Sequence, residues 1–229
     1  MMRAGVAAVA VLLTATGADA AGRAVMFRTV DGRAVNGLIF EAGQRPAPAV
    51  VLVPMLGRGR DDWQAVGDRL ADANITALAI DLPGLGSPGD PQSLAAWHTD
   101  VVAAVSFLAG RPDVRASSIG VAGASLGATL AALAGTADPR IRSLALVSPS
   151  LDYRGVRIES TMKQLGRPAL LIASMRDPYA ARSTRELARE SAGLREMRWS
   201  EEAAHGTVLL GRDPDLTVTL VEWFRRTLG

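Results

Sequence analysis

The chain has 229 residues, of which 48% are hydrophobic and 21% are charged, and its formal net charge is +2 at pH 7. This length and composition suit one sizeable globular domain and leave too little chain for two. The basic residues are scattered rather than clustered, which argues against a nucleic-acid-binding surface. The absence of cysteine excludes disulfides and thiol chemistry.

The N-terminus has the pattern of a secretory signal. It begins with a short positively charged region (MMR), continues with an apolar run and ends in the small-x-small pattern ADA at residues 18–20. We therefore predict a signal peptide over residues 1–20 and a mature domain over residues 21–229. Because the apolar run is short for a membrane span, we expect a secreted or periplasmic protein with no stable membrane anchor after cleavage.

The predicted elements of the mature domain begin with an antiparallel pair. Apolar runs at 25–27 and 35–40 flank Asp31 and Gly32, a strong hairpin turn. Continuous apolar runs then alternate with amphipathic segments, which predicts strands at 49–53, 75–80, 119–122, 141–147, 169–173 and 194–199. The intervening helices are predicted at 61–73, 91–109, 125–134, 180–192 and 213–228. This alternation predicts an α/β fold with a mostly parallel eight-stranded sheet and helices on both faces.

The pentapeptide GASLG at residues 123–127 carries the clearest chemical signal. It follows a β-favouring apolar run and precedes a small-residue segment that is typical of a helix. Strand, G-x-S-x-G and helix in that order are the context of a nucleophile elbow, in which a serine sits on a sharp turn. Ser125 is therefore the candidate nucleophile, and the N–H of Leu126 directly after it is a candidate oxyanion donor.

A serine hydroxyl needs a general base at neutral pH, and the chain has two histidines. His205 lies in a loop between the last predicted strand and the last predicted helix, whereas His98 lies inside a predicted helix. Loops at the carboxyl ends of strands converge on one crevice in an open α/β sheet. We therefore favour His205 as the base and interpret His98 as a surface or half-buried helix residue.

The base must in turn be oriented by a carboxylate. Asp177 follows the predicted strand 169–173, and with it the chain order of serine, aspartate and histidine is that of an α/β-hydrolase triad. Asp152 and Asp213 are the alternatives. Asp152 also suits a solvated loop, and Asp213 suits an N-cap before a proline, so we favour Asp177.

Five further motifs, together with the pentapeptide, resemble the landmarks of the α/β-hydrolase superfamily in their order, and the resemblance covers residues 25–228. They are VLVPMLG at 51–57, DDW at 61–63, AIDLPGLGS at 79–87, MRDPY at 175–179 and AHGT at 204–207. The chain is similar in particular to dienelactone-hydrolase-like proteins and small carboxylesterases. This resemblance implies the α/β-hydrolase fold and a serine hydrolase that needs no metal or cofactor.

The resemblance also implies a second oxyanion donor in the loop after the strand 49–53. Aligning the loops places Leu56 at the donating position, with Met55 as the alternative. Many family members carry His-Gly where this chain has Pro54 and Met55, and Pro54 has no N–H to donate. Arg58 and Arg60 beside this loop could hold a substrate carboxylate, but we favour solvated loop arginines.

The superfamily often carries a cap domain after the strand that here ends near residue 148, and only residues 149–167 separate that strand from the next. We therefore expect a loop and one short helix without a cap domain, and an open, shallow pocket. The predicted rim comprises Met55, Leu56, Leu85, Leu126, Met175 and Val208.

These residues together predict a serine hydrolase that cleaves carboxylic esters with short or accessible acyl and alkyl groups through an acyl-enzyme. The expected partner is a small-molecule ester. The alternatives are a peptidase, thioesterase or lactonase with the same triad, or a non-catalytic binding protein, because fold does not determine function.

Overall fold

The computed structural model describes residues 22–83, 90–189 and 192–229. One large β-sheet forms the centre of the fold. Among these residues, eight strands pair in the order β1-β2-β4-β3-β5-β6-β9-β10. Their bounds are β1 Arg23–Arg28, β2 Ala34–Phe40, β3 Ala47–Val53, β4 Thr76–Ile80, β5 Val114–Ala124, β6 Ile141–Val147, β9 Ala169–Ser174 and β10 Arg195–Ser200. The predicted signal peptide, residues 1–20, lies outside the described residues.

The sheet is antiparallel at one end and parallel elsewhere. The β1–β2 hairpin and the pairing of β2 with β4 are antiparallel, whereas β3, β4, β5, β6, β9 and β10 pair in parallel. The predicted mostly parallel eight-stranded sheet is therefore confirmed. Because parallel strands end at one edge, the loops after β3, β5, β9 and β10 gather there.

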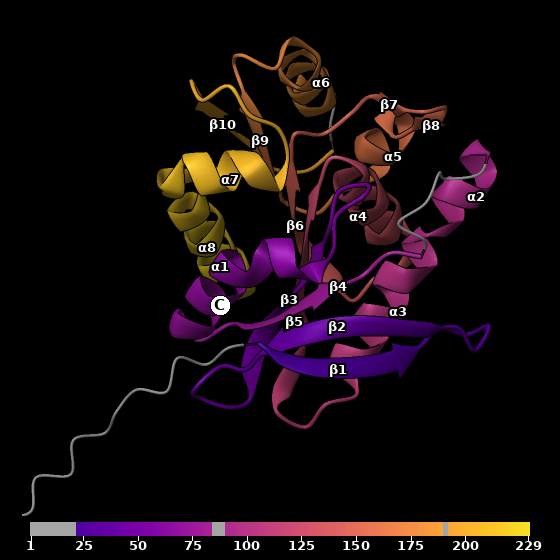
Figure 1. Cartoon of the computed structure of the whole chain (residues 1–229), viewed down its shortest axis with the longest axis vertical. Coiled ribbons are helices and arrows are strands. Elements are labelled where there is room, and N and C mark those ends of the chain that lie inside the picture. The colour runs from indigo at the N-terminus through magenta and orange to yellow at the C-terminus, as the bar shows by residue number, and fades with distance from the viewer. Residues whose placement is uncertain (1–21, 84–89, 190–191) are drawn as a thin grey trace, which may run out of the picture.

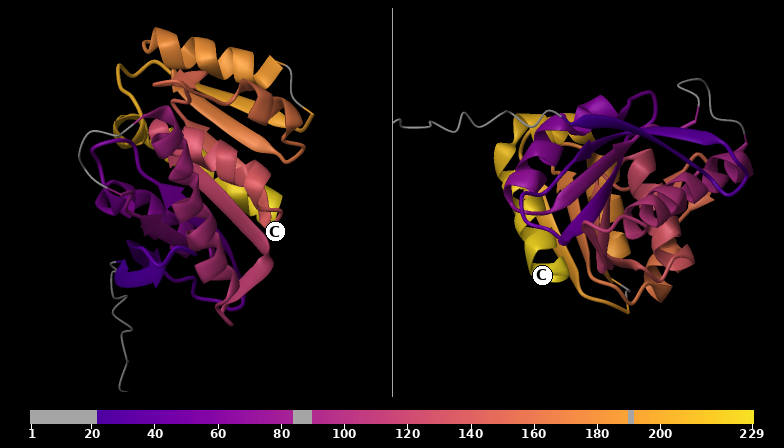
Figure 2. Two further views of the ribbon diagram at one scale, coloured as in Figure 1. Left: turned by 90° about the vertical axis from the view of Figure 1, so that its right-hand side faces the viewer. Right: turned by 90° about the horizontal axis from the view of Figure 1, so that it is seen from below.

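Helices cover both faces of the sheet, as predicted. Their bounds are η1 Arg60–Trp63 (a 3₁₀ helix), α1 Gln64–Asp72, α2 Pro91–Ala96, α3 His98–Ala109, α4 Leu126–Ala137, α5 Glu159–Gln164, α6 Pro178–Arg189, α7 Thr207–Arg212 and α8 Pro214–Leu228. α1, α7 and α8 lie on one side, and α3, α4 and α5 lie on the other (Figure 1). Figure 2 shows the sheet between these two layers.

Two hydrophobic cores result, one on each face of the sheet. Alternate residues of β3 divide between them: Val51 and Val53 join the core under α3 and α4, while Val50 and Leu52 join the core under α1 and α8. All four side chains are completely buried. Burial on both faces explains why the central strands have continuous apolar sequences rather than alternating ones.

The structure also differs from the predicted elements in several places. The predicted helix 91–109 is two helices that meet at Trp97, and β5 begins at Val114 rather than at residue 119. The short helix α7 was not predicted, and neither were two short strands after β6. These elements are β7 Asp152–Tyr153 and β8 Val156–Arg157, and two residues are too few to show a hydrophobic period.

The segment between β6 and β9 contains the hairpin β7–β8 and the six-residue helix α5 in place of a cap domain. This agrees with the predicted compactness, although the hairpin is additional. Among the described residues, no helix has the length and apolar character that crossing a membrane requires.

Candidate active site

Ser125 occupies a strained turn between β5 and α4. Its backbone angles are φ 53° and ψ −113°, a combination that non-glycine residues rarely adopt. The Ser125 N–H donates to the Val147 carbonyl at 2.9 Å, which ties the turn to the neighbouring strand β6. Ser125 as a whole is 8% exposed, so the turn holds a nearly buried serine at the end of a strand.

The glycines on either side make this turn possible. A Cβ on Gly123 would lie 2.1 Å from the Gly127 carbonyl oxygen, and a Cβ on Gly127 would lie 2.3 Å from the Val53 carbonyl oxygen. Both atoms belong to the backbone, which cannot move aside as a side chain could. Glycine is therefore required at both positions by close packing of β5, α4 and the end of β3.

Two backbone N–H groups lie near this turn as oxyanion candidates. Leu126 is the first residue of α4, where an N–H has no partner within the helix and the helix dipole favours negative charge. Leu56 follows β3 in a turn closed by the Arg58 N–H and the Met55 carbonyl at 3.2 Å. Because β3 and β5 are parallel neighbours that pair Val53 with Gly123, their following loops lie at the same edge.

Asp177 and His205 lie side by side although 28 residues separate them. His205 Nδ1 lies 2.5 Å from Asp177 Oδ2, and the two side chains are 47% and 20% exposed. Asp177 follows β9 and its other oxygen accepts from the Ala180 N–H at 3.1 Å, in the first turn of α6. That second hydrogen bond holds the carboxylate in place to orient the imidazole.

The loop that carries His205 is tied to two other loops. Gly206, which has φ 60°, donates its N–H to Ser148 Oγ at 2.9 Å. Thr207 donates its hydroxyl to Asp62 Oδ2 at 2.9 Å. These bonds join the loop that carries His205 to the end of β6 and to the segment after β3. Both neighbouring segments therefore help to keep the imidazole in place.

The alternative residues from the sequence have other partners. His98 begins α3 and its Nδ1 lies 2.8 Å from the Ala95 carbonyl oxygen. Asp152 pairs with Arg157 at 2.9 Å. Asp213 stands at the N-cap position of α8, but its carboxylate accepts from the Ser200 hydroxyl at 2.5 Å instead of capping the helix. The structure therefore brings Asp177, rather than these carboxylates, to a histidine.

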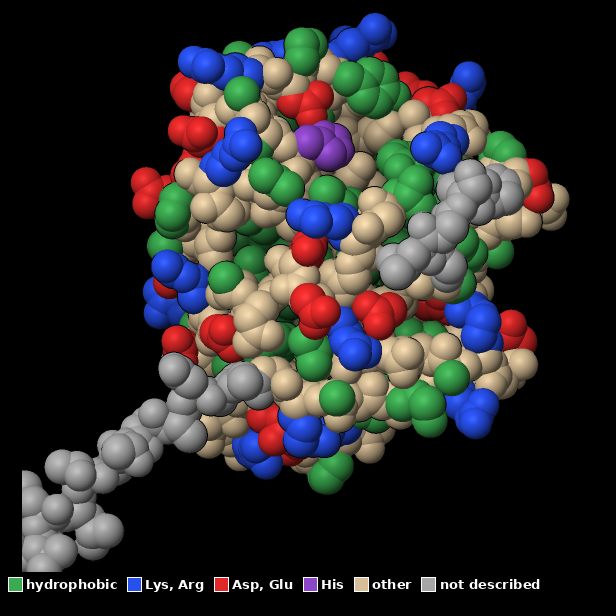
Figure 3. All heavy atoms as spheres, viewed as in Figure 1, with side chains coloured by type: hydrophobic (Ala, Val, Ile, Leu, Met, Phe, Trp, Pro, Cys, Tyr) green, Lys and Arg blue, Asp and Glu red, His purple; other side chains and the backbone are tan. Residues whose placement is uncertain are grey.

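The structure describes some of the residues that were predicted to form the rim of the pocket. Met55 lies against Gly206, whose Cβ would be 2.5 Å from the Met55 sulfur. Met175 is exposed, and Val208 is half-buried in α7. Leu85 lies outside the described residues. A histidine side chain is exposed on the face shown in Figure 3, with acidic and hydrophobic side chains near it.

Arg58 and Arg60 already have carboxylate partners. Arg58 pairs with Asp62 at 2.9 Å, and Arg60 pairs with Asp81 at 3.2 Å. A substrate carboxylate would have to displace these partners. We therefore keep the interpretation of Arg58 and Arg60 as loop arginines, which are ion-paired as well as solvated. Among the described residues, no cluster of three His, Cys, Asp or Glu side chains suits a metal ion.

Tyr153 is a site residue that the sequence reasoning missed. It lies on the hairpin of β7 and β8, where burial raises the pKa of its phenol and the charge of Arg154 and the hydroxyl of Ser125 offset part of that rise. Within the described part of the chain, His205 is hydrogen-bonded to Asp177 and no hydrogen bond joins it to the Ser125 hydroxyl. No local signal indicated this hairpin, because its strands of two residues are too short to show a hydrophobic period.

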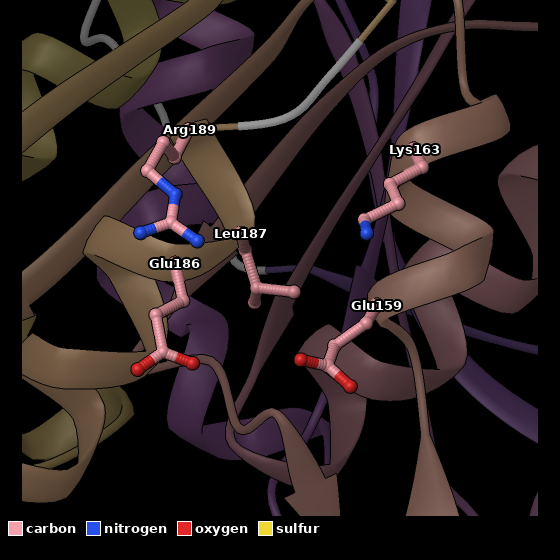
Figure 4. A pocket seen from close by; sticks show the side chains of 5 residues that line it. All are labelled: Glu159, Lys163, Glu186, Leu187 and Arg189. Carbon is pink, nitrogen blue, oxygen red and sulfur yellow. The ribbon is translucent and has the colours of Figure 1, made fainter.

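A separate small cavity of about 120 Å³ lies between α5 and α6 and is not part of this site. Figure 4 shows its lining residues, which are Glu159, Lys163, Glu186, Leu187 and Arg189. Its α6 residues lie toward the end of the helix remote from Asp177, roughly 15 Å along the axis at the rise of an α-helix.

One protein-family model and two of the known proteins that match this chain in sequence are described here. A family model described as the alpha/beta hydrolase family matches residues 50–228. A polyketide transferase of Stachybotrys chlorohalonatus is 30% identical over 158 residues, which are 67% of this chain and 50% of that protein. A thiohydrolase of Arthrinium phaeospermum is 32% identical over 131 residues, 55% of this chain and 42% of that protein. The chain thus spans half or less of the length of these curated relatives.

Solved structures share the architecture at low sequence identity. A dienelactone hydrolase from Anabaena variabilis has a TM-score of 0.77 and 18% identity, over 91% of this chain and 98% of that one. An esterase from Pyrococcus furiosus has a TM-score of 0.72 and 17% identity, over 91% of each chain. At these identities the likeness concerns the fold.

Proposed function

Because the chain belongs to the alpha/beta hydrolase family, we propose that it is a serine hydrolase that cleaves carboxylic esters through an acyl-enzyme at Ser125. The observation that carries the proposal is the 2.5 Å contact between His205 and Asp177 at the sheet edge where the strained turn presents Ser125. Serine, aspartate and histidine come from three separate loops, in the chain order of an α/β-hydrolase triad.

The geometry supports a division of roles. With Nδ1 directed at Asp177, the imidazole keeps Nε2 as the proton acceptor. Ser125 Oγ bonds to the ester carbonyl carbon while its proton passes to His205. The proton then goes to the departing alcohol as the carbon–oxygen bond of the ester breaks. Water, activated by the same imidazole, releases the acyl group and restores Ser125.

One hydrogen bond of this mechanism has still to form in the free protein. In the described structure His205 is hydrogen-bonded to Asp177 and not to the Ser125 hydroxyl, which must therefore turn toward His205 when substrate binds. Hydrogen bonds of this kind often form fully only in the substrate complex. The oxyanion would accept from Leu126, whose N–H is at the start of α4, and from Leu56 in the loop after β3.

The short segment between β6 and β9 supports small or accessible esters as substrates. It holds a hairpin and a six-residue helix, which leave the mouth of the site without a cap domain. We also propose export to the periplasm or the medium by the signal peptide at residues 1–20, and a small-molecule ester as the partner.

Thioesters are the second candidate substrate. The observation in their favour is the similarity over 131 residues to a protein named thiohydrolase. The same Ser125, His205 and Asp177 chemistry applies, since a thiolate leaves more readily than an alkoxide. A panel of p-nitrophenyl esters and N-acetylcysteamine thioesters of matched chain length separates the two substrates by kcat/KM.

Labelling and turnover by the purified protein test the proposal. A fluorophosphonate probe should label the wild type and leave Ser125→Ala unlabelled, and Ser125→Ala should lose at least about 10³-fold in kcat on short p-nitrophenyl esters. Thermal unfolding of Ser125→Ala controls for the fold. Unchanged ester turnover in folded Ser125→Ala would refute the role of Ser125, and folded wild-type protein that neither labels nor turns over ester or thioester would favour a binding protein.

A further inference from the structure

One carboxylate oxygen beside the active site is bonded to two loops at once. Asp62 Oδ2 accepts from the Thr207 hydroxyl at 2.9 Å and lies 2.9 Å from Nε of Arg58. Thr207 comes two residues after His205 in the chain. On the other side of this oxygen, Arg58 comes two residues after Leu56. The carboxylate therefore joins the loop that carries the proposed base to the loop that carries the proposed second oxyanion donor.

Asp62 belongs to the DDW motif at residues 61–63, which lies in the short helix η1. At the start of η1, the Arg60 N–H donates to Asp81 Oδ1 at 2.9 Å, and the Arg60 guanidinium lies 3.2 Å from the other oxygen of that carboxylate. At its end, Trp63 is completely buried in the core under α1 and α8. Both ends of η1 are thus anchored, so Asp62 is presented from a fixed piece of backbone.

The bond from Thr207 is the more protected of the two. Thr207 is 7% exposed, and a hydrogen bond to an ionised acceptor is roughly twice as strong as one between neutral groups. The Arg58 side chain is 48% exposed, and ion pairs this exposed contribute little. The Thr207 bond therefore contributes most of the connection between Asp62 and the loops.

The same two loops also touch directly at Met55. Thr207 Oγ lies 3.8 Å from Met55 Sδ. Gly206, which has φ 60°, has no room for a side chain there, because its Cβ would lie 2.5 Å from the same sulfur. The hydrogen bond to Asp62 thus acts at a close contact, where a displacement of Thr207 carries over to Gly206 and His205.

The imidazole of His205 depends on this loop for its position. Its side chain is 47% exposed, so core packing holds it only in part. Asp177 lies 2.5 Å from Nδ1 and fixes one edge of the ring, while the loop must bring Nε2 to Ser125. A misplacement of about 1 Å can cost about 10²-fold in rate. A bond that fixes the loop at Thr207 therefore bears directly on kcat.

We propose that Asp62 is a positioning residue of the reaction. By accepting from the Thr207 hydroxyl, it holds the loop of His205 at the distance from the loop of Leu56 that acyl transfer requires. This inference rests on the proposed function, because it concerns the placement of the proposed base. Since Asp62 acts through Thr207 rather than on the substrate, its loss should lower kcat and leave KM on small esters nearly unchanged.

Two substitutions at one position test the role of the hydroxyl. Thr207→Val replaces it with a methyl group of similar size, whereas Thr207→Ser keeps it. We expect kcat on p-nitrophenyl butyrate to fall about tenfold or more in Thr207→Val, with KM within about twofold, as the loss of one hydrogen bond to a charged group predicts. Thr207→Ser should keep kcat within about threefold of the wild type. An equal loss in both variants would assign the effect to the methyl group and overturn the inference, and so would an unchanged kcat in Thr207→Val.

A double-mutant cycle tests whether Asp62 acts through Thr207. Asp62→Ala should lower kcat by a factor similar to that of Thr207→Val. The variant with both substitutions should lie within about twofold of the slower single variant, because each change removes the same bond. Independent effects would multiply to a loss of about a hundredfold or more, and that result would overturn the inference.

Thr219→Val is the matched control for the loss of a threonine hydroxyl. The Thr219 hydroxyl donates to the Asp215 carbonyl at 2.9 Å within α8, so its kcat should stay within about twofold of the wild type. Thermal unfolding of every variant controls for the fold. If Asp62→Ala does not fold, the comparison of Thr207→Val with Thr207→Ser decides by itself.

These outcomes are distinct from a failure of the proposed function. If the wild type labels with the fluorophosphonate probe and turns over butyrate while folded Thr207→Val keeps its kcat, only the inference about Asp62 fails. If the folded wild type neither labels nor turns over ester, the proposed function fails and the inference fails with it.

Discussion

The turn that carries Ser125 and the loops that carry Asp177, His205 and Tyr153 meet at one edge of the sheet, but different interactions hold them. The Ser125 turn is buried and is shaped by backbone atoms in contact, as the spaces around Gly123 and Gly127 show. The other loops are held by side-chain hydrogen bonds, and the His205 side chain is 47% exposed.

This difference separates stability from activity. Where backbone packs on backbone, an added atom has no room, so a substitution disturbs the fold itself. Where side chains hold one another near solvent, a substitution removes a group without leaving a void in the core. Changes to Gly123 or Gly127 should therefore lower the free energy of unfolding, and changes to Asp177 or His205 should lower kcat/KM with little effect on unfolding.

Asp177→Asn should give the largest effect and should leave stability almost unchanged. The amide oxygen can still accept from the Ala180 N–H, but the amide nitrogen is a donor that favours the wrong tautomer of His205. We expect kcat/KM to fall about 10⁴-fold, or about 5.5 kcal/mol of transition-state stabilisation. Steady-state kinetics and thermal unfolding measure the two quantities.

Asp213→Asn is the matched control for that substitution. Asp213 accepts from Ser200 and has no contact with a histidine in the described structure, so its kcat/KM should stay within a few-fold of wild type. Inactivation of Asp213→Asn together with an active Asp177→Asn would reverse the assignment of the carboxylate.

Gly127→Ala should give the next largest effect, and here the effect is on stability. Its Cβ would meet the Val53 and Pro54 carbonyl oxygens at 2.3 and 2.6 Å, so β3 and α4 would have to separate. We expect the free energy of unfolding to fall by about 3 kcal/mol or more, measured by urea denaturation.

Gly211→Ala controls for the loss of a glycine. Gly211 lies in α7 with nothing near the position of an added Cβ, so alanine there should leave stability unchanged or raise it by up to about 1 kcal/mol. Equal stability of Gly127→Ala and Gly211→Ala would show that the Ser125 turn tolerates more space than its packing indicates.

Tyr179→Phe should give the smallest effect. It removes the hydroxyl that bonds to Asp152 and Ser150, at the base of the hairpin. We expect the free energy of unfolding to fall by about 1 kcal/mol, measured by urea denaturation, with kcat/KM on short esters within a few-fold of wild type. A loss of 3 kcal/mol or more would place the hairpin with the buried core instead of with the side-chain-held loops.

Much of the fold could be predicted because its signals are local. The continuous apolar runs of β3, β4, β6 and β9 and the helical segments between them appear within short stretches of sequence. The Ser125 turn could be predicted for the same reason, since strand, glycine, serine, glycine and helix are adjacent in the chain. The hairpin of β7 and β8 and the break at Trp97 were missed because such short elements have no period.

The sequence by itself determined that a serine lies on a sharp turn at the end of a buried strand, since glycine spacing and hydrophobic period specify that geometry locally. It also narrowed the partners to two histidines and a few aspartates. Only the tertiary structure decided that Asp177, rather than Asp152 or Asp213, bonds to His205, and that the His205 loop is bonded to Ser148 and Asp62. Those contacts join loops that are distant in the chain, and strand order and side-chain packing bring the loops together.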